Sequence, residues 1–268
     1  IVSDMANMEY ISKNHPDLSI HCSVQTGSAN AETINFWQEN FNVNCVVLPR
    51  VLSVDEVAHI VKNTKVDIEV FALGSLCTSY PGRCNMSQFI TGESTNTAGV
   101  CTSPKFLDFK EDGEDGVTLT LNNVALNKIP HCHQGDAVHQ CKGHSGGEVV
   151  KDRKDGWDNS FIVNKRHICK GQFINADLNT TGYAMHDYVI LNTFSILSKF
   201  IEAGVHAFKI EGRQRPSSYS KNATQIMREA IDLYYSNPEK YRVKAEWDSA
   251  VKEMFQEMGS SVGPYLGR

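Results

Sequence analysis

Short apolar segments alternate with helical patterns through the first 75 residues, and this alternation constrains the fold more than any other feature of the sequence. The segments recur roughly every 20 to 25 residues, a spacing typical of strands joined by helices in a parallel sheet. The segment 45–48 is apolar at every position, as strands buried on both faces are. The sequence predicts parallel strands at 1–3, 19–24, 45–48 and 66–72, with helices at 5–14, 31–40 and 54–62 between them.

The same pattern returns near the carboxyl end, where it predicts helices at 191–202, 221–235 and 245–258 and a strand at 206–210. We therefore expect an α/β fold, a TIM-barrel-like (β/α) domain that covers residues 1–268. Because Ile1–Ser3 reads as the end of a buried strand, we expect the barrel to lack its first strands and the sheet not to close.

Between 74 and 180 the sequence is rich in Gly, Ser, Thr, Asn, Cys and His, and it predicts only one hairpin, around 117–126. A structureless loop of this length is improbable in a compact domain. A metal cluster would provide the order that this loop region lacks.

Composition narrows the function classes. The net charge of −5 argues against general nucleic-acid binding, which requires a basic face. No stretch approaches the ~18 apolar residues of a membrane span, and no export signal is visible, so we expect a cytoplasmic protein. In such a protein the eight cysteines are expected to be thiols or metal ligands and not disulfides.

Three of these cysteines, Cys77, Cys84 and Cys101, follow the predicted strand end at 72 with spacing C-x6-C-x16-C. This spacing is wider than the knuckles that hold zinc and suits a larger iron–sulfur cluster. On spacing alone, three buried thiols are an equal alternative. Cys22 and Cys45 lie on predicted core strands and are expected to act as small apolar residues.

The stretch EVFALGSLCTSYPGRCNMSQF at 69–89 resembles the signature of the collagenase-like peptidase family U-32. The stretches VVLPRVLS at 46–53, TGESTNTAGVC at 91–101 and FKIEGRQRPSSYS at 208–220 extend the resemblance, most closely to the branch that acts in ubiquinone biosynthesis. The resemblance implies a [4Fe–4S] cluster held by four cysteines.

The fourth ligand has two candidates, because Cys-Lys-Gly occurs at both Cys141 and Cys169. The resemblance favours Cys169, which is followed by an aromatic residue and reaches the Leu-Asn-Thr segment at 191–193 at the family distance. With Cys77, Cys84, Cys101 and Cys169 as ligands, the His- and Cys-rich stretch 128–160 becomes an insertion. That stretch is either a variable loop or a second metal site.

A charged group lies at the end of the predicted strand at 206–210 and in the segment after it: Lys209, Glu211, Arg213 and Arg215. Arg50 follows the strand at 45–48 and would face the same rim, since barrel sites assemble at the carboxyl ends of strands. The loops after 72 and 210 are expected to share that rim. The guanidinium fork suits carboxylates, so these residues are candidates to bind an acidic ligand.

The resemblance implies an O2-independent hydroxylase subunit in ubiquinone biosynthesis. The oxygen donor would be a small acid such as prephenate, the acceptor a quinone precursor, and the partner a related family member in a heterodimer. Alternatives are an RNA-modifying hydroxylase of the same family, a peptidase, and a non-catalytic metal-stabilised binding module. No recognisable protease arrangement of residues occurs in the sequence.

Overall fold

The structure is a computed structural model. It describes residues 1–77, 79, 81–85, 88, 189–212, 216–255 and 259–267, together with five strands between 107 and 183. In this part of the chain, no helix has the length and apolar character needed to cross a membrane.

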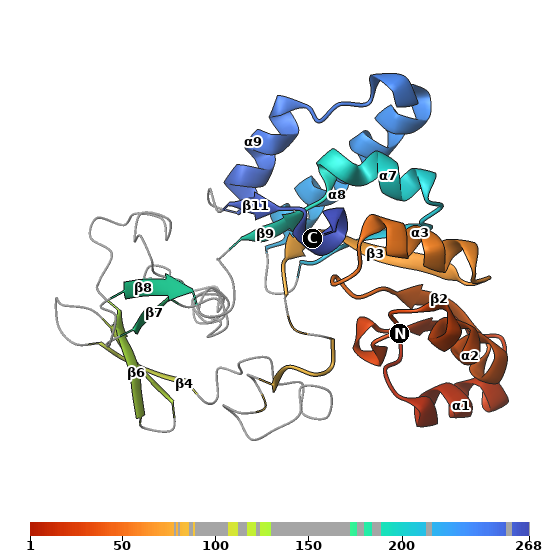
Figure 1. The fold of residues 1–268 in the computed structure, drawn as a ribbon, viewed down its shortest axis with the longest axis horizontal. Helices are drawn as coiled ribbons and strands as arrows, with labels where there is room; N and C mark the ends of the chain where they lie inside the picture. Colours follow the sequence, from red (N-terminus) through yellow and green to blue (C-terminus); the bar gives the residue numbers. More distant parts are fainter. Residues whose placement is uncertain are drawn as a thin grey trace.

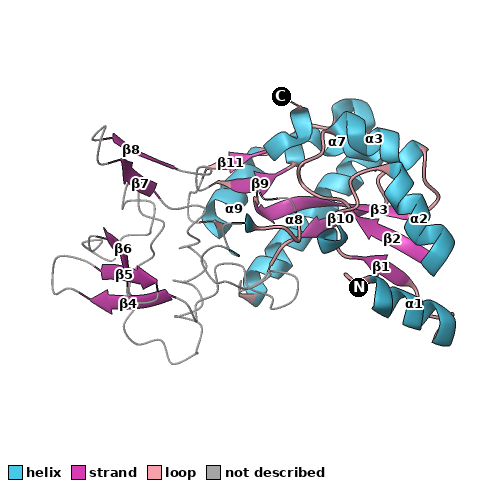
Figure 2. Cartoon of the chain, turned by 60° about the horizontal axis from the view of Figure 1, so that its bottom comes forward, coloured by secondary structure: helices cyan, strands magenta, loops and turns pink. Residues whose placement is uncertain are grey.

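The main sheet is built on parallel strands, as the sequence predicts. Strands β1 (Ile20–Cys22), β2 (Val43–Val47) and β3 (Asp67–Ser75) pair side by side in parallel, and β10 (Ala207–Ile210) pairs in parallel with β3 (Figure 2). Of the predicted strand at 1–3, only Val2 pairs, through an isolated parallel bridge to Cys22. The described strands form an open sheet, and a closed barrel is not seen among them.

One part of the sequence prediction is wrong. The segment expected to begin a helix at 191 instead forms β9 (Ile190–Asn192), which runs antiparallel to the end of β3. The helix α7 (Leu197–Glu202) starts only after a 3-10 turn at Phe194–Ile196. The reason is that Thr193 donates both its backbone N–H and its hydroxyl to the carbonyl of Ala72, which fixes this segment on β3. Strand β11 (Ser260–Ser261), not expected from the sequence, pairs in parallel with β9.

The first three helices form where local signals predict them. Helices α1 (Met5–Asn14), α2 (Ala31–Phe41) and α3 (Val54–Lys62) each begin after a residue whose side chain accepts a hydrogen bond from a backbone N–H of the first turn. These capping residues are Asp4, Asn30 and Ser53. Such caps satisfy amide donors that the helix itself cannot pair.

The carboxyl-terminal helices differ slightly from their predicted bounds. Helix α8 (Ser217–Ser236) begins directly after Pro216, earlier than the predicted 221, and α9 (Ala245–Met254) ends before the predicted 258. A 3-10 turn at Pro238–Lys240 lies between them, and another at Gly263–Leu266 follows β11. In Figure 1, β2, α1 and α2 lie below β3, whereas α7, α8 and α9 lie above it, with α3 beside α7.

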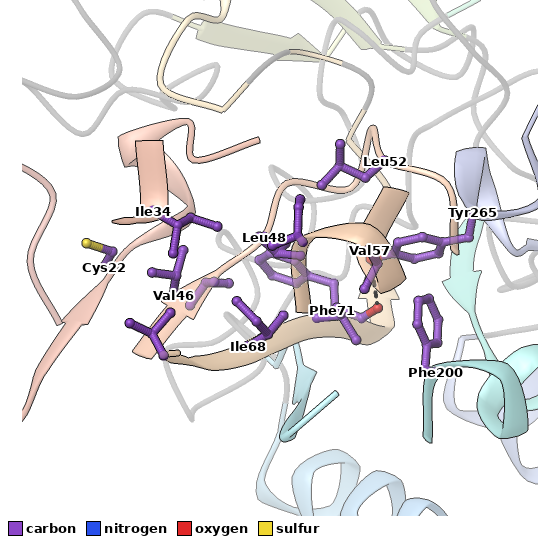
Figure 3. Packing of buried hydrophobic residues seen from close by; sticks show 14 of the residues in the cluster. Cys22, Ile34, Val46, Leu48, Leu52, Val57, Ile68, Phe71, Phe200 and Tyr265 are labelled. Carbon is purple, nitrogen blue, oxygen red and sulfur yellow. Dashed lines mark hydrogen bonds between the residues drawn. The ribbon is translucent and has the colours of Figure 1, made fainter. Parts of the chain in front are cut away.

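Two apolar clusters share β3. The first joins Ile68 and Val70 to side chains from α1, α2, α3 and α7, and Figure 3 shows its central part. The second joins Ala72 and Leu73 to α8 and α9. Strand β3 therefore passes through both cores, and its carboxyl end is held from both sides.

Five further strands are described between 107 and 183. Strands β4 (Leu107–Glu111), β5 (Val117–Leu121) and β6 (Val124–Ile129) form an antiparallel sheet, and β7 (Gln172–Asn175) pairs antiparallel with β8 (Thr180–Tyr183). The β5–β6 pair confirms the hairpin predicted around 117–126. The boundaries 74–180 and 128–160 stay predictions.

Candidate functional site at the carboxyl ends of the strands

Three candidate residues follow the carboxyl ends of parallel strands. Arg50 comes after β2, Cys77 after β3 and Glu211 directly after β10. Because β2 and β10 both run parallel to β3, these ends meet at one edge of the sheet. In parallel α/β folds this edge is where binding and catalytic loops gather.

The carboxyl end of β3 touches the start of the loop after β10 at Gly74. This glycine has φ of +137°, and a Cβ added to it would lie 2.6 Å from Glu211 Cβ and 2.9 Å from the Glu211 carbonyl oxygen. The backbone N–H of Glu211 also donates to the Leu73 carbonyl at 2.8 Å. Only glycine permits this approach of β3 to Glu211. That the loops after 72 and 210 share one rim stays a prediction.

Arg50 is the centre of the polar contacts at this rim. Its Nη2 donates to Oε2 of Glu211 in an ion pair, and its guanidinium carbon lies 3.5 Å from the centre of the Phe71 ring. The Arg50 side chain is only 11% exposed. Its Nε is buried and has no hydrogen-bond partner among the described residues. The guanidinium is thus held by a ring and a carboxylate, while its buried Nε donor lacks a partner among the described residues.

A second ion pair lies on the same face of the sheet. Lys209 Nζ is 2.6 Å from Glu69 Oε1, and Lys209 is the register partner of Phe71. Side chains alternate along a strand, so Glu69 and Phe71 face away from the side on which Ile68 and Val70 meet the helices. Among the described residues, this face therefore has two ion pairs, Arg50–Glu211 and Lys209–Glu69, and Lys209 already has a carboxylate partner.

Two tyrosines fix the backbone at the site. The Tyr265 hydroxyl donates to the carbonyl of Phe71 at 3.1 Å, and the Tyr219 hydroxyl donates to the carbonyl of Glu211 at 3.0 Å. Burial raises the pKa of Tyr265, and the nearby charge of Arg50 opposes that rise. The sequence predicts no role for either tyrosine. Tyr219 lies within the quoted stretch 208–220, which was a signal, whereas Tyr265 had none.

The first two candidate metal ligands lie on either side of Ser79. Cys77 is exposed and its Sγ lies 3.9 Å from the Ser79 carbonyl oxygen, while the Ser79 hydroxyl donates to Cys84 Sγ at 3.6 Å. Gly82, with φ of +76°, allows the turn between the two cysteines. Two soft thiol donors on one turned loop at the rim fit a thiolate-bound cluster.

The other candidates lie outside the described residues: Cys101, Cys169, Cys141, Arg213 and Arg215. Within the described part of the chain, no group of three or more His, Cys, Asp or Glu residues is placed to hold a metal ion. The proposed ligand set is therefore placed only at Cys77 and Cys84.

Cys22 and Cys45 are core residues, as predicted. They are 0% and 4% exposed. Burial raises the pKa of Cys22 to about 12 and that of Cys45 to about 11. Both thiols stay protonated near neutral pH, which makes them poor metal ligands.

Comparison with known proteins gives a family and several relatives. The sequence profile of peptidase family U32 matches residues 1–266. The tRNA hydroxylation protein P of Haemophilus influenzae is 30% identical over 233 residues, which cover 87% of this chain and 48% of that protein. The protein of the same name from Escherichia coli is 28% identical over 235 residues, with the same two shares of 87% and 48%.

A protein named for a different activity is also similar. A collagenase of Porphyromonas gingivalis is 26% identical over 283 residues, which cover 100% of this chain and 52% of that protein. The chain spans about half the length of these curated relatives. No solved structure gives a significant match to it.

Proposed function

The chain belongs to peptidase family U32, and from this membership we propose that it is the cluster-bearing part of an enzyme that hydroxylates its substrate without O2. Two relatives that share 30% and 28% identity with it are named for tRNA hydroxylation. This similarity is the observation that carries the proposal. Cys77 and Glu211 follow the carboxyl ends of β3 and β10, two strands that pair with each other, and this agrees with the proposal.

We propose that Cys77, Cys84, Cys101 and Cys169 hold a [4Fe–4S] cluster, with Cys141 as the alternative fourth ligand. When bound, the cluster would supply one-electron transfer. The Ser79 hydroxyl, which donates to Cys84 Sγ, would then tune its potential, because hydrogen bonds to ligand sulfur favour the reduced state. The end of β10 with Lys209, and the loop after it with Glu211 and Arg213, are proposed to lie beside a small acidic oxygen donor such as prephenate.

The first candidate substrate is tRNA, on the names of the two hydroxylation relatives. The net charge of −5 supplies no general attraction to RNA. Recognition of tRNA would therefore depend on a local basic surface, and mutation of exposed cations should weaken it.

The second candidate substrate is a quinone precursor, in a UbiU-like role with a UbiV-like partner as a heterodimer. The stretches 69–89 and 208–220 favour this candidate, because they resemble that branch of the family. Residues within these two stretches touch each other, at Gly74 and Glu211.

Deletion of the gene followed by complementation separates these candidates. Hydroxylated tRNA nucleosides and anaerobically formed ubiquinone are measured by mass spectrometry in the deletion strain. Full-length wild-type protein should restore one of the two products, and Cys84→Ala should restore neither. Loss of tRNA hydroxylation identifies the first candidate, and loss of ubiquinone identifies the second. Unchanged levels of both, with chelator-insensitive cleavage of casein by the purified protein, would overturn the proposal in favour of a peptidase.

A further inference from the structure

The Arg50 guanidinium is fixed in place, but its hydrogen bonding is incomplete. Its side chain is 11% exposed, its guanidinium carbon lies 3.5 Å from the Phe71 ring centre, and Glu211 accepts only from Nη2. Nε shares one edge of the planar fork with Nη2, and it is buried without a hydrogen-bond partner in the described part of the chain. A buried donor without a partner costs free energy, so a structural ion pair alone does not explain this arrangement.

Glu211 is the partner that can move. Its side chain is 33% exposed, three times the fraction of Arg50. Its backbone is fixed, because its N–H donates to Leu73 and its carbonyl accepts from Tyr219. Rotation of the Glu211 side chain toward solvent would therefore free Arg50 Nη2 without shifting β10 or the rim.

The other ion pair on this face, Lys209–Glu69, does not involve Arg50 or Glu211. Lys209 and Glu69 already neutralise each other at 2.6 Å. If the Glu211 carboxylate swings away, Arg50 keeps one positive charge on a partly buried surface backed by Phe71. In such surroundings a cation binds an oxyanion more strongly than it would in water.

We propose that Arg50 is the receptor for an oxyanion, a carboxylate or a phosphate, and that Glu211 is its built-in competitor. The ligand would accept from Nε and Nη2 together, in the bidentate geometry that suits guanidinium. Glu211 would occupy Nη2 in the free protein and leave when the ligand binds. This inference does not depend on the proposed hydroxylation, because binding is measured without turnover.

The test is anion binding to the full-length protein, purified without O2, by calorimetry at constant ionic strength. Malonate and inorganic phosphate are used in separate titrations, against chloride, to separate a carboxylate site from a phosphate site. The Glu211→Gln variant keeps the size of the side chain but loses its charge. It should bind at least one of the two probes about tenfold more tightly than wild type, because the probe no longer displaces a carboxylate.

The Arg50→Lys change introduced into Glu211→Gln should abolish this gain, since lysine keeps the charge but has no fork. Glu9→Gln and Arg228→Lys are matched controls, because both residues form exposed pairs within single helices. They should bind the probes as wild type does. A gain in affinity cannot come from misfolding. Equal affinity of Glu211→Gln and wild type for both probes would overturn the proposal, as would a gain that persists with Arg50→Lys.

Discussion

Cys45 lies in the core beside charged neighbours, and its environment sets a pH dependence. Burial, with Glu69 and Asp67 adding to it, raises the pKa of Cys45 from 9.0 to about 11 in the folded protein. Below about pH 9 both the folded and unfolded states keep the thiol proton. Above it the unfolded state loses the proton while the folded state keeps it, so the stabilisation from Cys45 declines until pH passes about 11.

We expect the stability advantage of wild type over Cys45→Ala to depend on pH. Their difference in free energy of unfolding should shrink between pH 7.5 and 10.5, by at most about 1.4 kcal/mol per pH unit. Urea unfolding at the two pH values measures it. A difference that stays constant with pH would show that the Cys45 thiol ionises as freely in the folded protein as in the unfolded chain.

Gly74 supports the rim through its backbone, and its replacement should be costly. In Gly74→Ala the added Cβ would meet Glu211, and φ of +137° is a conformation that alanine rarely adopts. We expect a loss of about 2 kcal/mol or more in the free energy of unfolding. Gly267→Ala is the control, because Gly267 has φ of +77° but nothing within 4 Å of an added Cβ. If urea unfolding shows that both variants lose equal stability, then the contact between residue 74 and Glu211 does not contribute to the loss.

At the scale of elements, the turn at Gly263–Leu266 is tied to the middle of β3. Tyr265 is 1% exposed, and its hydroxyl donates to the Phe71 carbonyl, a bond shown as a dashed line in Figure 3. Tyr265→Phe keeps the ring packing against Phe200 and removes only this bond. The expected loss is about 1 kcal/mol in the free energy of unfolding, measured by urea titration.

Tyr10→Phe is the matched control for that change, because Tyr10 is 60% exposed on α1. It should leave stability unchanged. Comparable losses in the two variants would mean that the turn does not anchor β3.

The elements that the sequence predicts correctly depend on local signals. Ser53 and Glu56 form a capping box within one turn, and they fix the start of α3. Strand β9 was not predicted, because its position depends on the hydrogen bonds from Thr193 to Ala72, which is 121 residues away in sequence. The apolar pattern of that segment fits a helix as well as a strand, and only the distant partner decides between them.

The site shows the same division between local and distant information. Position at or just after a strand end is a local signal. It identified Lys209 on β10, and Arg50, Glu211 and Cys77 after strands, as candidates for one rim. Their partners are not local: Arg50 and Glu211 are 161 residues apart, and Tyr265 and Phe71 are 194 apart. The sequence therefore indicated which residues are candidates for the rim, but not that Glu211 accepts a hydrogen bond from Arg50.

At the scale of the whole molecule, Cys77 and the Arg50–Glu211 pair follow the carboxyl ends of neighbouring strands, and the Lys209–Glu69 pair joins two of these strands. Parallel pairing of β2, β3 and β10 brings these ends together. The described strands form an open sheet with β1 at one end of the strand order, and the chain spans about half the length of its relatives. The proposed function depends most on which cysteines hold the cluster.

Iron and acid-labile sulfide counts, with visible absorption, on full-length protein purified without O2 test those ligands most directly. Wild type should contain a [4Fe–4S] cluster. Single changes of Cys77, Cys84, Cys101 or Cys169 to alanine should lose most of the iron and the absorption. Cys141→Ala and Cys45→Ala should keep both. Full iron content in Cys84→Ala, or in all the variants alike, would contradict the account, and loss in Cys141→Ala with retention in Cys169→Ala would reassign the fourth ligand.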